Sequence, residues 1–335
     1  MIIKSITLTN FRNHSQYYLD CKDDVTLILG ENGSGKTSVL EAIYILTRGK
    51  SFRASDADII KRGAPFYRIE IENNSGEKSV VTFDQHRKTF IIMDKKTYRL
   101  PKNSKYPIIL FLPSDLNLIG GSPNRHRDYF DRFFAQISED YNTNLSKYEK
   151  ALHQRNEVLK SNSCLSSNLF SWNLLLAKYG TKIYQHRQQF VATINQNFTK
   201  SYTSIANNSD EVNLLYQTTI TSPSESQYLN ILESNLTKDL YLGHTSFGIH
   251  RDDFEFIFNH QPADGSASRG EARSIILALK FIEADLITKE LHQKPIILLD
   301  DVFSELDESR RKSLIKNFKH HQIIITSVEN VKLNY

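Results

Sequence analysis

The sequence has few cysteines and no long apolar run, and each shortage excludes a class of protein. Its two cysteines, Cys21 and Cys164, are far apart and have no histidine or cysteine at metal-ligand spacing, which argues against a disulfide framework or a zinc site. No stretch approaches the roughly 18 apolar residues of a membrane-spanning helix. The start of the chain alternates like a strand and lacks the apolar run of a signal peptide. We therefore expect a soluble protein of the reducing cytoplasm.

The composition is that of a globular protein with a mild excess of positive charge. Of the 335 residues, 39% are hydrophobic and 24% are charged, which is typical of a folded chain with one large or two ordinary domains. The formal net charge of +4 permits nucleic-acid binding but does not argue for it. The distribution of charge along the chain is therefore more informative than its sum.

A glycine-rich segment near the N-terminus has the sequence of a phosphate-binding loop. It lies between a predicted buried strand at 25–29 and a helical apolar pattern from residue 36 to about 46. Its residues are Gly30, Glu31, Asn32, Gly33, Ser34, Gly35, Lys36 and Thr37. In such a loop backbone N–H groups point at phosphate oxygens, the lysine reaches the β- and γ-phosphates, and the hydroxyl ligates Mg²⁺. We therefore predict that this segment binds ATP and that Thr37 is a metal ligand.

A second apolar run ends in two carboxylates. Residues 295–299 predict a strand buried on both faces, and Asp300 and Asp301 follow at its carboxyl end. Alone, this pattern would equally describe a strand that ends at a solvated turn. Beside a phosphate loop, Asp300 would hold Mg²⁺ directly or through water, and Asp301 would orient or activate the attacking water. The two segments together predict ATP hydrolysis with Asp301 as the catalytic residue.

The segment from Ala267 to Arg273 opens a predicted helix at 270–292. Ser268 and Gly270 at a helix N-terminus offer a hydroxyl, free N–H groups and the positive end of the helix dipole, which suit an anion. Taken alone, the same residues also describe an ordinary helix cap.

Taken in chain order, the phosphate loop, the helix start at Ser268 and the strand that ends in Asp300 and Asp301 resemble the ATP-binding-cassette heads of the SMC-like DNA repair ATPases. Within that group the chain is similar to the bacterial recombination mediators, and the strings that carry this likeness span nearly the whole chain. They are Asn10-Phe11-Arg12-Asn13; Pro113-Ser114-Asp115-Leu116, followed by Gly121-Ser122-Pro123, Arg125, Arg127 and Asp131; Gly248-Ile249-His250-Arg251-Asp252-Asp253; and Asp300-Asp301-Val302-Phe303-Ser304-Glu305-Leu306-Asp307. No long coiled coil is predicted, which separates the chain from the SMC proteins proper.

The resemblance implies that ATP is held between two copies of the chain. Ser268 and Gly270 of one copy would contact the γ-phosphate on the loop of the other, Arg12 would join the nucleotide-binding residues, and Asp307 would lie near the dimer interface. ATP binding would drive dimerisation, and slow, DNA-dependent hydrolysis would release it. Further implied are binding to double-stranded or gapped DNA, help in loading a recombinase at gaps or junctions, mediator partners such as RecR, and no membrane.

The sequence departs from the family pattern in three places, one of which is that it stops at Tyr335, soon after the last predicted strand, so that any final hairpin is expected to be short or missing. Glu271 stands where a glutamine is usual, which leaves the hydrogen bonding of that segment open. Thr326 and Ser327 follow the last predicted strand, at 322–326, where transport cassettes carry a histidine. The γ-phosphate sensor is therefore not assigned.

The predicted fold class is α/β: an ABC-type P-loop ATPase head with an antiparallel β region and an inserted helical lobe. The ATPase lobe would contain residues 1–112 and 240–335, with the antiparallel region at about 66–112. The helical lobe would contain residues 113–239. Within it, apolar residues at helical spacing predict helices at 125–160 and 168–202, separated by a polar stretch and packed as an antiparallel hairpin. A strand at 247–258 and a helix at 307–319 complete the prediction.

Two segments could follow a DNA backbone. Residues 87–105 contain seven basic residues and one acid, and residues 160–209 contain five basic residues and no acid, with aromatics between them. Arg48, Lys50 and Arg53 form a further candidate group. A solvated charged face is the alternative for each of these residues. His250 and the charges after it predict a turn that leads into a strand, rather than a metal or acid–base site.

Two other function classes remain open at this point. The first is a different P-loop enzyme: a kinase, which would not need Ser268 and Gly270, or a transport ATPase subunit, which would be expected to carry the sensor histidine. The second is a nucleotide-gated DNA-binding module with negligible turnover.

Overall fold

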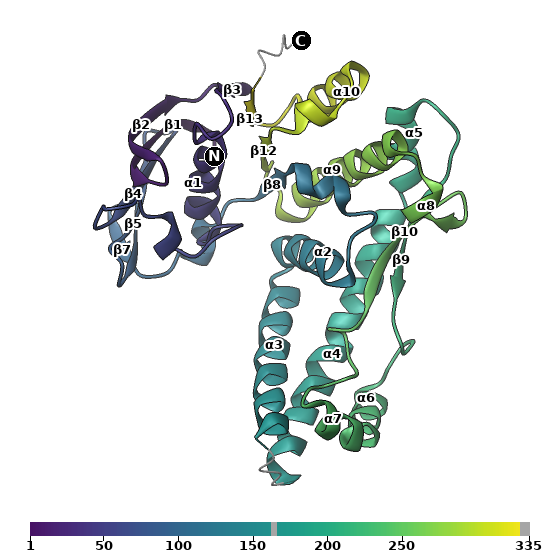
Figure 1. Cartoon of the computed structure of the whole chain (residues 1–335). Coiled ribbons are helices and arrows are strands. Elements are labelled where there is room, and N and C mark those ends of the chain that lie inside the picture. Colours follow the sequence, from purple (N-terminus) through teal and green to yellow (C-terminus); the bar gives the residue numbers. More distant parts are fainter. Residues whose placement is uncertain (162–165, 329–335) are drawn as a thin grey trace. The chain divides into compact units, whose positions relative to one another are not determined.

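The structure is a computed structural model that describes residues 1–161 and 166–328, which divide into two compact units. Unit 1 contains Met1–Leu116 and the chain from Glu283 onward, and unit 2 contains Asn117–Ile282 (Figure 1). The sequence prediction drew the second boundary at residue 240 instead. Residues 240–282 belong with unit 2 because strand β10 (Asp253–Phe258) pairs with β9 (Val212–Gln217) of the same unit.

Unit 1 contains a four-stranded parallel sheet with the order β3-β13-β12-β8. Its strands come from both ends of the chain, as the buried apolar runs predict. They are β3 (Val25–Leu29), β8 (Ile108–Phe111), β12 (Ile296–Asp300) and β13 (Ile323–Ser327). Strand β8 corrects one prediction: residues 108–111 lie in this parallel sheet and not in the antiparallel region. Their continuous run Ile-Ile-Leu-Phe is typical of a strand covered on both faces, rather than of an alternating one.

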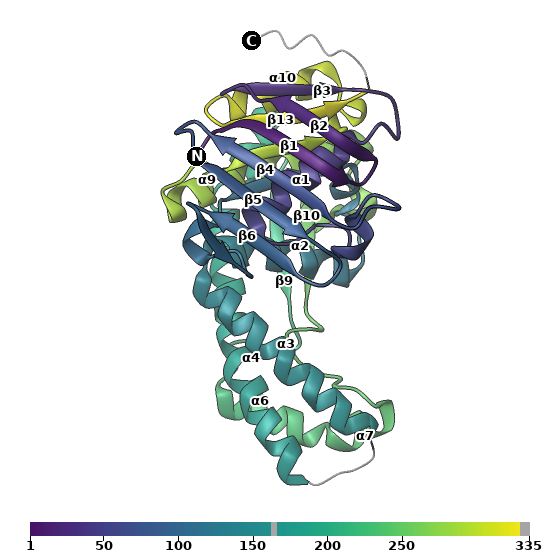
Figure 2. The same ribbon diagram turned by 90° about the vertical axis from the view of Figure 1, so that its left-hand side faces the viewer.

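A second sheet of unit 1 has six antiparallel strands in the order β2-β1-β4-β5-β6-β7, and Figure 2 shows most of them face-on. The strands are β1 (Ile3–Phe11), β2 (His14–Asp20), β4 (Tyr67–Asn73), β5 (Lys78–Phe83), β6 (Lys88–Ile92) and β7 (Lys95–Thr97). The pattern of buried and exposed residues along β4 alternates, which confirms the predicted antiparallel region from residue 67 to residue 97.

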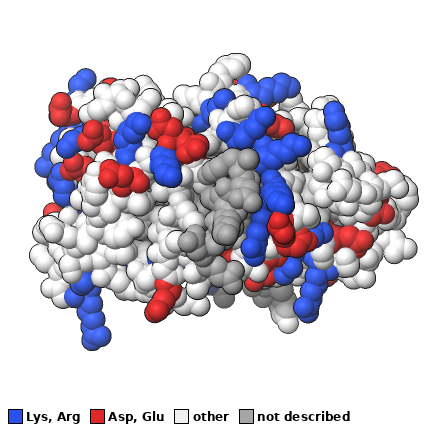
Figure 3. Space-filling model, turned by 90° about the horizontal axis from the view of Figure 1, so that it is seen from above, with Lys and Arg blue, Asp and Glu red and all other residues white. Residues whose placement is uncertain are grey.

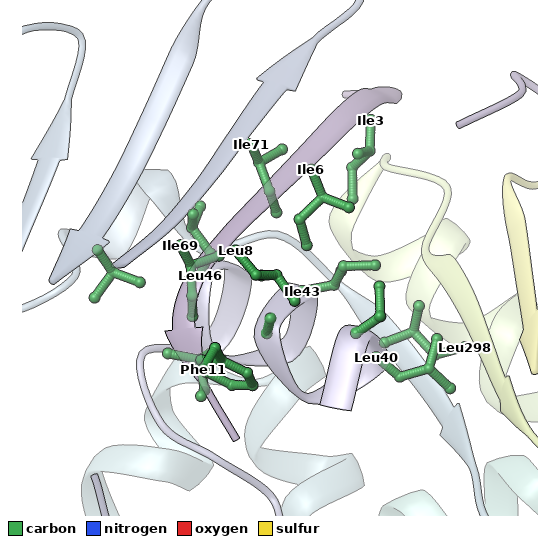
Figure 4. Close-up of a cluster of buried hydrophobic side chains, with 14 of the residues drawn as sticks. Ile3, Ile6, Leu8, Phe11, Leu40, Ile43, Leu46, Ile69, Ile71 and Leu298 are labelled. Atoms are coloured by element: carbon green, nitrogen blue, oxygen red, sulfur yellow. The ribbon is translucent and has the colours of Figure 1, made fainter. Parts of the chain in front are cut away.

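Helix α1 (Lys36–Arg48) packs against strands of both sheets, and its apolar side chains are part of the hydrophobic core of unit 1. The helix starts after Gly35 and ends at Gly49, both with positive φ, and the N–H of Gly49 donates to the carbonyl of Ile45 at 2.8 Å. In Figure 4, Leu40, Ile43 and Leu46 point into a cluster with side chains from β1, β4 and β12. Burial of these side chains at helical spacing fixes α1, and with it the end of the phosphate loop.

Unit 2 is mainly helical. Its first elements are α2 (Pro123–Ile137), α3 (Glu139–Lys160), α4 (Ser166–Asn195) and α5 (Phe198–Ala206), followed by α6 (Glu225–Ser234) and α7 (Leu236–Leu242). Helices α3 and α4 lie side by side in both ribbon views, as the predicted hairpin requires (Figures 1 and 2). The predicted helices at 125–160 and 168–202 were each too long, because α2 and α3 divide the first and α4 and α5 divide the second. The polar stretch between them falls largely on residues 162–165, and Cys164 with it lies outside the described residues.

A small antiparallel sheet, in the order β11-β10-β9, packs on these helices. Strand β10 begins at Asp253 and not at residue 247, so the predicted strand is too long. Residues 247–252 instead form a turn around Gly248, whose φ of 134° favours glycine and where a Cβ would lie 2.4 and 2.5 Å from the hydroxyls of Tyr148 and Tyr228. This is the charged turn that the sequence around His250 indicates.

The remaining elements are short or connect the others. They are β11 (Gln261–Pro262), α8 (Ala263–Ser266), α9 (Arg269–Leu291), α10 (Glu308–Phe318) and four 3₁₀ helices at Ala57–Ile59, Lys102–Ser104, Pro113–Asn117 and Val302–Glu305. The predicted helices at 270–292 and 307–319 are thus confirmed within one residue at each end. In the described part of the chain, no helix has both the length and the apolar character needed to cross a membrane.

Candidate functional site

The phosphate loop follows β3 directly, and β13 connects it to the carboxylate strand. Strand β13 pairs with β3 on one side and with β12 on the other, so that Thr326 is in register with both Ile28 and Asp300. The N–H of Gly30 donates to the carbonyl of Ser327 at 3.3 Å, which continues this pairing into the loop. Because the carboxyl ends of parallel strands meet at one sheet edge, the loop and Asp300 are neighbours.

Thr37 and Asp300, the two predicted metal ligands, are in direct contact. The Thr37 hydroxyl lies 2.8 and 3.0 Å from the two carboxylate oxygens of Asp300, although 263 residues separate them in the chain. The hydroxyl of Thr326, which is fully buried, donates to Asp300 Oδ1 at 2.8 Å. Asp300 is therefore held in one orientation by hydroxyl groups from α1 and β13.

Asp301 lies beside Asp300 but in a different environment. Its backbone has a φ of 50°, and its N–H donates to the carbonyl and the hydroxyl of Thr326 at 3.2 and 3.0 Å. Its Oδ1 atom is buried without a hydrogen-bond partner among the described residues. Burial raises the pKa of the Asp301 carboxyl, with Lys36 opposing this and the charge of Asp300 adding to it. A buried oxygen without a partner is a position at which a further polar group can be held.

Lys36 and the glycines shape the loop itself. The Lys36 ammonium donates to the carbonyl oxygens of Gly30 and Glu31 at 2.6 and 2.9 Å. Gly33 and Gly35 have φ values of 83° and 94°, in the left-handed region that favours glycine. These contacts give the segment the compact turn that the motif predicts.

Most of the predicted site residues line a pocket of about 490 Å³ in unit 1. Its walls combine the loop and the carboxylates with two further segments, the turn after β1 and the segment after α1. The lining residues are Arg12, Asn13, Asn32, Gly33, Gly35, Lys36, Thr37, Ser38, Arg53, Ala54, Asp300 and Asp301. Gly30, Glu31 and Ser34 belong to the same loop without lining the pocket.

The turn between β1 and β2 braces the loop, and the sequence analysis missed this contact. The side-chain amide of Asn13 donates to the carbonyl of Gly33 at 3.2 Å. The His14 ring lies with Nε2 at 3.2 Å from the carbonyl of Gly35 and packs on Tyr17. The string Asn10–Asn13 drew attention to this turn, but only Arg12 was assigned a role.

A buried carboxylate, Glu41 of α1, joins Arg12 to a second arginine. Arg12 donates to it from Nε and Nη2 at 2.9 and 2.7 Å, Arg53 from Nη2 at 2.9 Å, and the Ser51 hydroxyl at 2.6 Å. Burial raises the pKa of Glu41, but the hydrogen bonds from these three donors outweigh it, so the pKa of this carboxyl lies below its usual range. An acid within the apolar face of a predicted helix was the signal that could have found it.

Ser268 and Gly270 lie in unit 2, at the N-terminus of α9. The Ser268 hydroxyl accepts the N–H of Glu271 at 3.3 Å, and the Glu271 carboxylate accepts the N–H of Ser268 at 2.7 Å. These reciprocal bonds form a capping box. The glutamate that replaces the usual glutamine therefore caps the helix through its carboxylate.

The basic residues proposed as DNA contacts fall into two groups, those that are buried or paired with a carboxylate and those that are exposed. Arg187, which was counted among the DNA candidates of residues 160–209, is fully buried and bound to Asp131 and the Tyr141 hydroxyl, so it is unavailable to DNA. Within residues 87–105, Lys88 is bound to Asp56. The other basic residues there are exposed: Arg87, Lys95, Lys96, Arg99, Lys102 and Lys105.

His250 has a structural environment. Its ring lies 2.8 Å from the Tyr148 hydroxyl and 3.1 Å from the carbonyl of Thr245. Burial lowers the pKa of His250 to about 4, so the ring is neutral at physiological pH. In residues 1–161 and 166–328, no group of three or more histidine, cysteine and acidic residues is arranged to hold a metal ion.

Comparison with known proteins identifies relatives over the full length of the chain. The family described as "AAA ATPase domain" matches residues 1–334. The DNA replication and repair protein RecF of Clostridioides difficile is 33% identical over 98% of this chain and 92% of its own length. The protein of the same name from Acholeplasma laidlawii is 34% identical over 97% of this chain and 93% of its own.

Solved structures agree with these relatives. A recombination mediator protein RecF with ATP, described as part of the RecFOR pathway, superposes with a TM-score of 0.88 at 27% identity, covering 99% of this chain and 93% of that one. A second RecF structure, described as RecF-ATPrS, gives a TM-score of 0.87 at 28% identity over 98% and 92% of the two chains. The predicted likeness to bacterial recombination mediators and the predicted fold class are confirmed.

Alanine substitutions at Gly33 and Gly35 separate the effect of backbone strain from that of the contact between His14 and Gly35. Both glycines have positive φ, so each substitution should lower the free energy of unfolding by about 1–2 kcal/mol. A Cβ on Gly35 would also lie 2.4 Å from His14 Nε2, whereas none of the described atoms lies within 4 Å of a Cβ on Gly33. Gly35→Ala should therefore be the more destabilising by about 1 kcal/mol in urea titrations. Adding His14→Ala to both variants should abolish the difference, and an undiminished difference would contradict this account.

Proposed function

The chain belongs to the RecF family of DNA replication and repair proteins, and on this basis we propose that it is an ATP-dependent DNA-binding protein with a slow ATPase. The observation that carries the proposal is the contact of the Thr37 hydroxyl with Asp300 at 2.8 Å. This contact places the end of the phosphate loop beside the end of the carboxylate strand. Lys36 and Asp301 line the same pocket. The match to an ATPase family over residues 1–334, and the relatives solved with ATP, support the same conclusion.

The triphosphate of ATP would lie on the loop Gly30–Thr37. Backbone N–H groups of the loop and the positive end of the α1 dipole would face the phosphate oxygens. Lys36 would exchange its contacts with the carbonyls of Gly30 and Glu31 for the β- and γ-phosphates. Arg12 also lines the pocket and adds a second cation.

The donor set at Thr37 and Asp300 fits Mg²⁺. A hydroxyl and a carboxylate side by side offer the hard oxygen ligands that this ion takes, and Mg²⁺ usually keeps several waters and binds phosphates as well. Bound there, the ion would neutralise charge on the phosphates. Thr326 holds the Asp300 carboxylate in place for this role.

Asp301 would orient and activate the water that attacks the γ-phosphate. Its buried Oδ1 is without a hydrogen-bond partner among the described residues, and its pKa is raised, so the carboxylate is a better proton acceptor than an exposed aspartate. The adjacent Asp300 is held by two hydroxyls instead. The two neighbouring carboxylates thus differ in environment, as different roles require.

ATP would also join two copies of the chain. Ser268 and Gly270 begin α9, where the hydroxyl, the backbone N–H groups and the helix dipole suit the γ-phosphate of a nucleotide held by the other copy. Asp307, which caps α10 by accepting the N–H of Arg310 at 2.9 Å, would lie near this interface. Because ATP would then bind the closed dimer more tightly than the monomer, binding would favour closure and hydrolysis would reverse it.

DNA would be bound through its backbone. The exposed basic residues of the segment 87–105 on the β6–β7 side of the antiparallel sheet are the best candidates, and the Arg87 guanidinium lies over the Tyr98 ring at 4.5 Å from its centroid. Charges of both signs are mixed over the face seen in Figure 3, in keeping with a net charge of only +4. We further propose double-stranded or gapped DNA as the substrate, RecR as a partner and a role in recombinase loading; relatives described as RecFOR-pathway mediators support this.

A P-loop kinase and a transport ATPase subunit are disfavoured as alternatives. The relatives that match nearly the full length of the chain share the description DNA replication and repair protein RecF. A nucleotide-gated module with negligible turnover shares the same pocket. Its distinguishing property is that the wild-type chain binds ATP without measurable hydrolysis.

Asp301→Asn should lower the ATPase rate at least about 100-fold, because the amide cannot accept the proton of the attacking water. ATP affinity, measured by equilibrium titration, should change little. Single-turnover hydrolysis of radiolabelled ATP measures the rate. An unchanged rate would remove Asp301 from the mechanism, whereas a wild-type rate no higher than that of ATP alone in buffer would favour the module without turnover.

A mixture of two inactive variants tests the shared site. Asp301→Asn removes the catalytic group and Ser268→Arg blocks the second half-site, so each variant alone should hydrolyse ATP very slowly. In a heterodimer with one normal site, a 1:1 mixture should recover about a quarter of the wild-type rate, because half the dimers are mixed and half their sites are intact. No recovery, with sedimentation velocity finding only monomers at saturating ATP, would contradict the dimer.

Charge reversal tests the DNA surface. The triple variant Lys95→Glu, Lys96→Glu and Arg99→Glu should weaken binding to a gapped duplex at least tenfold at low salt and flatten its salt dependence, because phosphate contacts are lost. Fluorescence anisotropy measures the affinity, and ATPase rates with and without the duplex measure the coupling. The matched control reverses Lys312, Lys316 and Lys319, which are exposed on or just after α10 of the same unit. Equal losses in both variants would refute a contact at residues 95–99.

A further inference from the structure

We propose that Glu41 is a positioning residue of the nucleotide site, which holds Arg12 and Arg53 against the phosphates of the bound nucleotide. The inference rests on the proposed ATP binding and extends it to two residues outside the sequence motifs, Glu41 and Arg53. Glu41 itself does not line the pocket, whereas both of its arginine partners do. Its action on the nucleotide is therefore indirect.

Glu41 connects three segments of the pocket wall. It lies on α1, one turn after Thr37, and its side chain is fully buried. Arg12 reaches it from the turn between β1 and β2 with two donors, and Arg53 and Ser51 reach it from the segment after α1. A single carboxylate thus holds guanidinium groups that come from two different segments, the β1–β2 turn and the segment after α1.

The backbone at Arg12 is arranged for this contact. Its φ of 53° lies in the left-handed region, which a residue with a side chain adopts only when its surroundings compensate the strain. The N–H of Arg12 donates to the carbonyl of Ile59 at 2.8 Å, and Nη1 donates to the carbonyl of Asp58 at 2.9 Å. The turn therefore aims the side chain at Glu41 and the pocket.

Arg53 retains donors for a ligand. Its Nη2 is bound to Glu41, with Ser38 Oγ at 3.5 Å, while its Nε and Nη1 have no hydrogen-bond partner within residues 1–161 and 166–328. The side chain is 38% exposed and lines the pocket. A guanidinium with unused planar donors matches a phosphate group, which it can bind through two parallel hydrogen bonds.

The charge balance also points to an anionic ligand. Two arginines share one carboxylate, so this cluster of three groups has a net positive charge of one, next to Lys36. Without Glu41 the two guanidiniums would repel each other and turn toward solvent. With it, they remain close together and within reach of the phosphate chain on the loop.

The test compares ATP and GTP affinities of the full chain and its Glu41→Gln variant, measured by equilibrium titration with Mg²⁺. Glutamine keeps the shape but removes the charge, so affinity should fall about tenfold, as for loss of a hydrogen bond to a charged group. The loss should be equal for ATP and GTP if the arginines contact phosphate. A loss confined to ATP would assign them to the base and overturn the phosphate contact. Glu41→Asp, which keeps the charge, should recover part of the affinity.

Two further variants separate positioning from folding. Arg53→Ala alters a partly exposed side chain, so it should leave the thermal midpoint near wild type and lower affinity about tenfold; adding Glu41→Gln should then cost less than it does alone. Glu70→Gln is the matched control, because Glu70 also binds two cations, Arg68 and Lys78, but lies on β4 away from the pocket lining. It should leave affinity unchanged. Normal affinity in Glu41→Gln and Arg53→Ala would refute the inference, whereas failure of the wild-type chain to bind ATP would refute the proposed function instead.

Discussion

The pairing of β13 with both β3 and β12 is the constraint on which the pocket depends. It places the end of β3, where the phosphate loop begins, beside the end of β12, where the two carboxylates lie. The same strand supplies Thr326, whose hydroxyl bonds to Asp300 and accepts the N–H of Asp301. A one-residue slip of β13 would turn Thr326 to the other face of the sheet and separate these groups.

Residues that act through backbone geometry or metal chemistry could be predicted from the sequence. The loop Gly30–Thr37 and the pair Asp300–Asp301 follow fixed spacings, because phosphate and Mg²⁺ impose them. The parallel sheet was visible as buried apolar runs at both ends of the chain. Strand β8 was assigned to the wrong sheet because its run is only four residues long and follows the alternating segments along the chain, although its apolar pattern favours the parallel sheet.

Side chains that act through distant partners could not be predicted in this way. Arg187 appears in the sequence as one of several basic residues, but its partner Asp131 is 56 positions away. Arg155 and Asp239 form a fully buried pair across 84 positions. Glu41 and Arg53 are 12 positions apart, beyond the reach of helical spacing. Only the fold determines which of these charges are buried together and which face the solvent.

The order of β3 and β13 along the chain also determines when the pocket can form during synthesis. The phosphate loop is synthesised well before β13, the described neighbour of β3 in its sheet, which begins at Ile323. Such non-local pairing forms late and slowly, so an incomplete chain exposes apolar residues of β3 and α1. A nascent chain therefore carries the complete phosphate motif long before it has a nucleotide site, and a chain that stops short of Thr326 never acquires one.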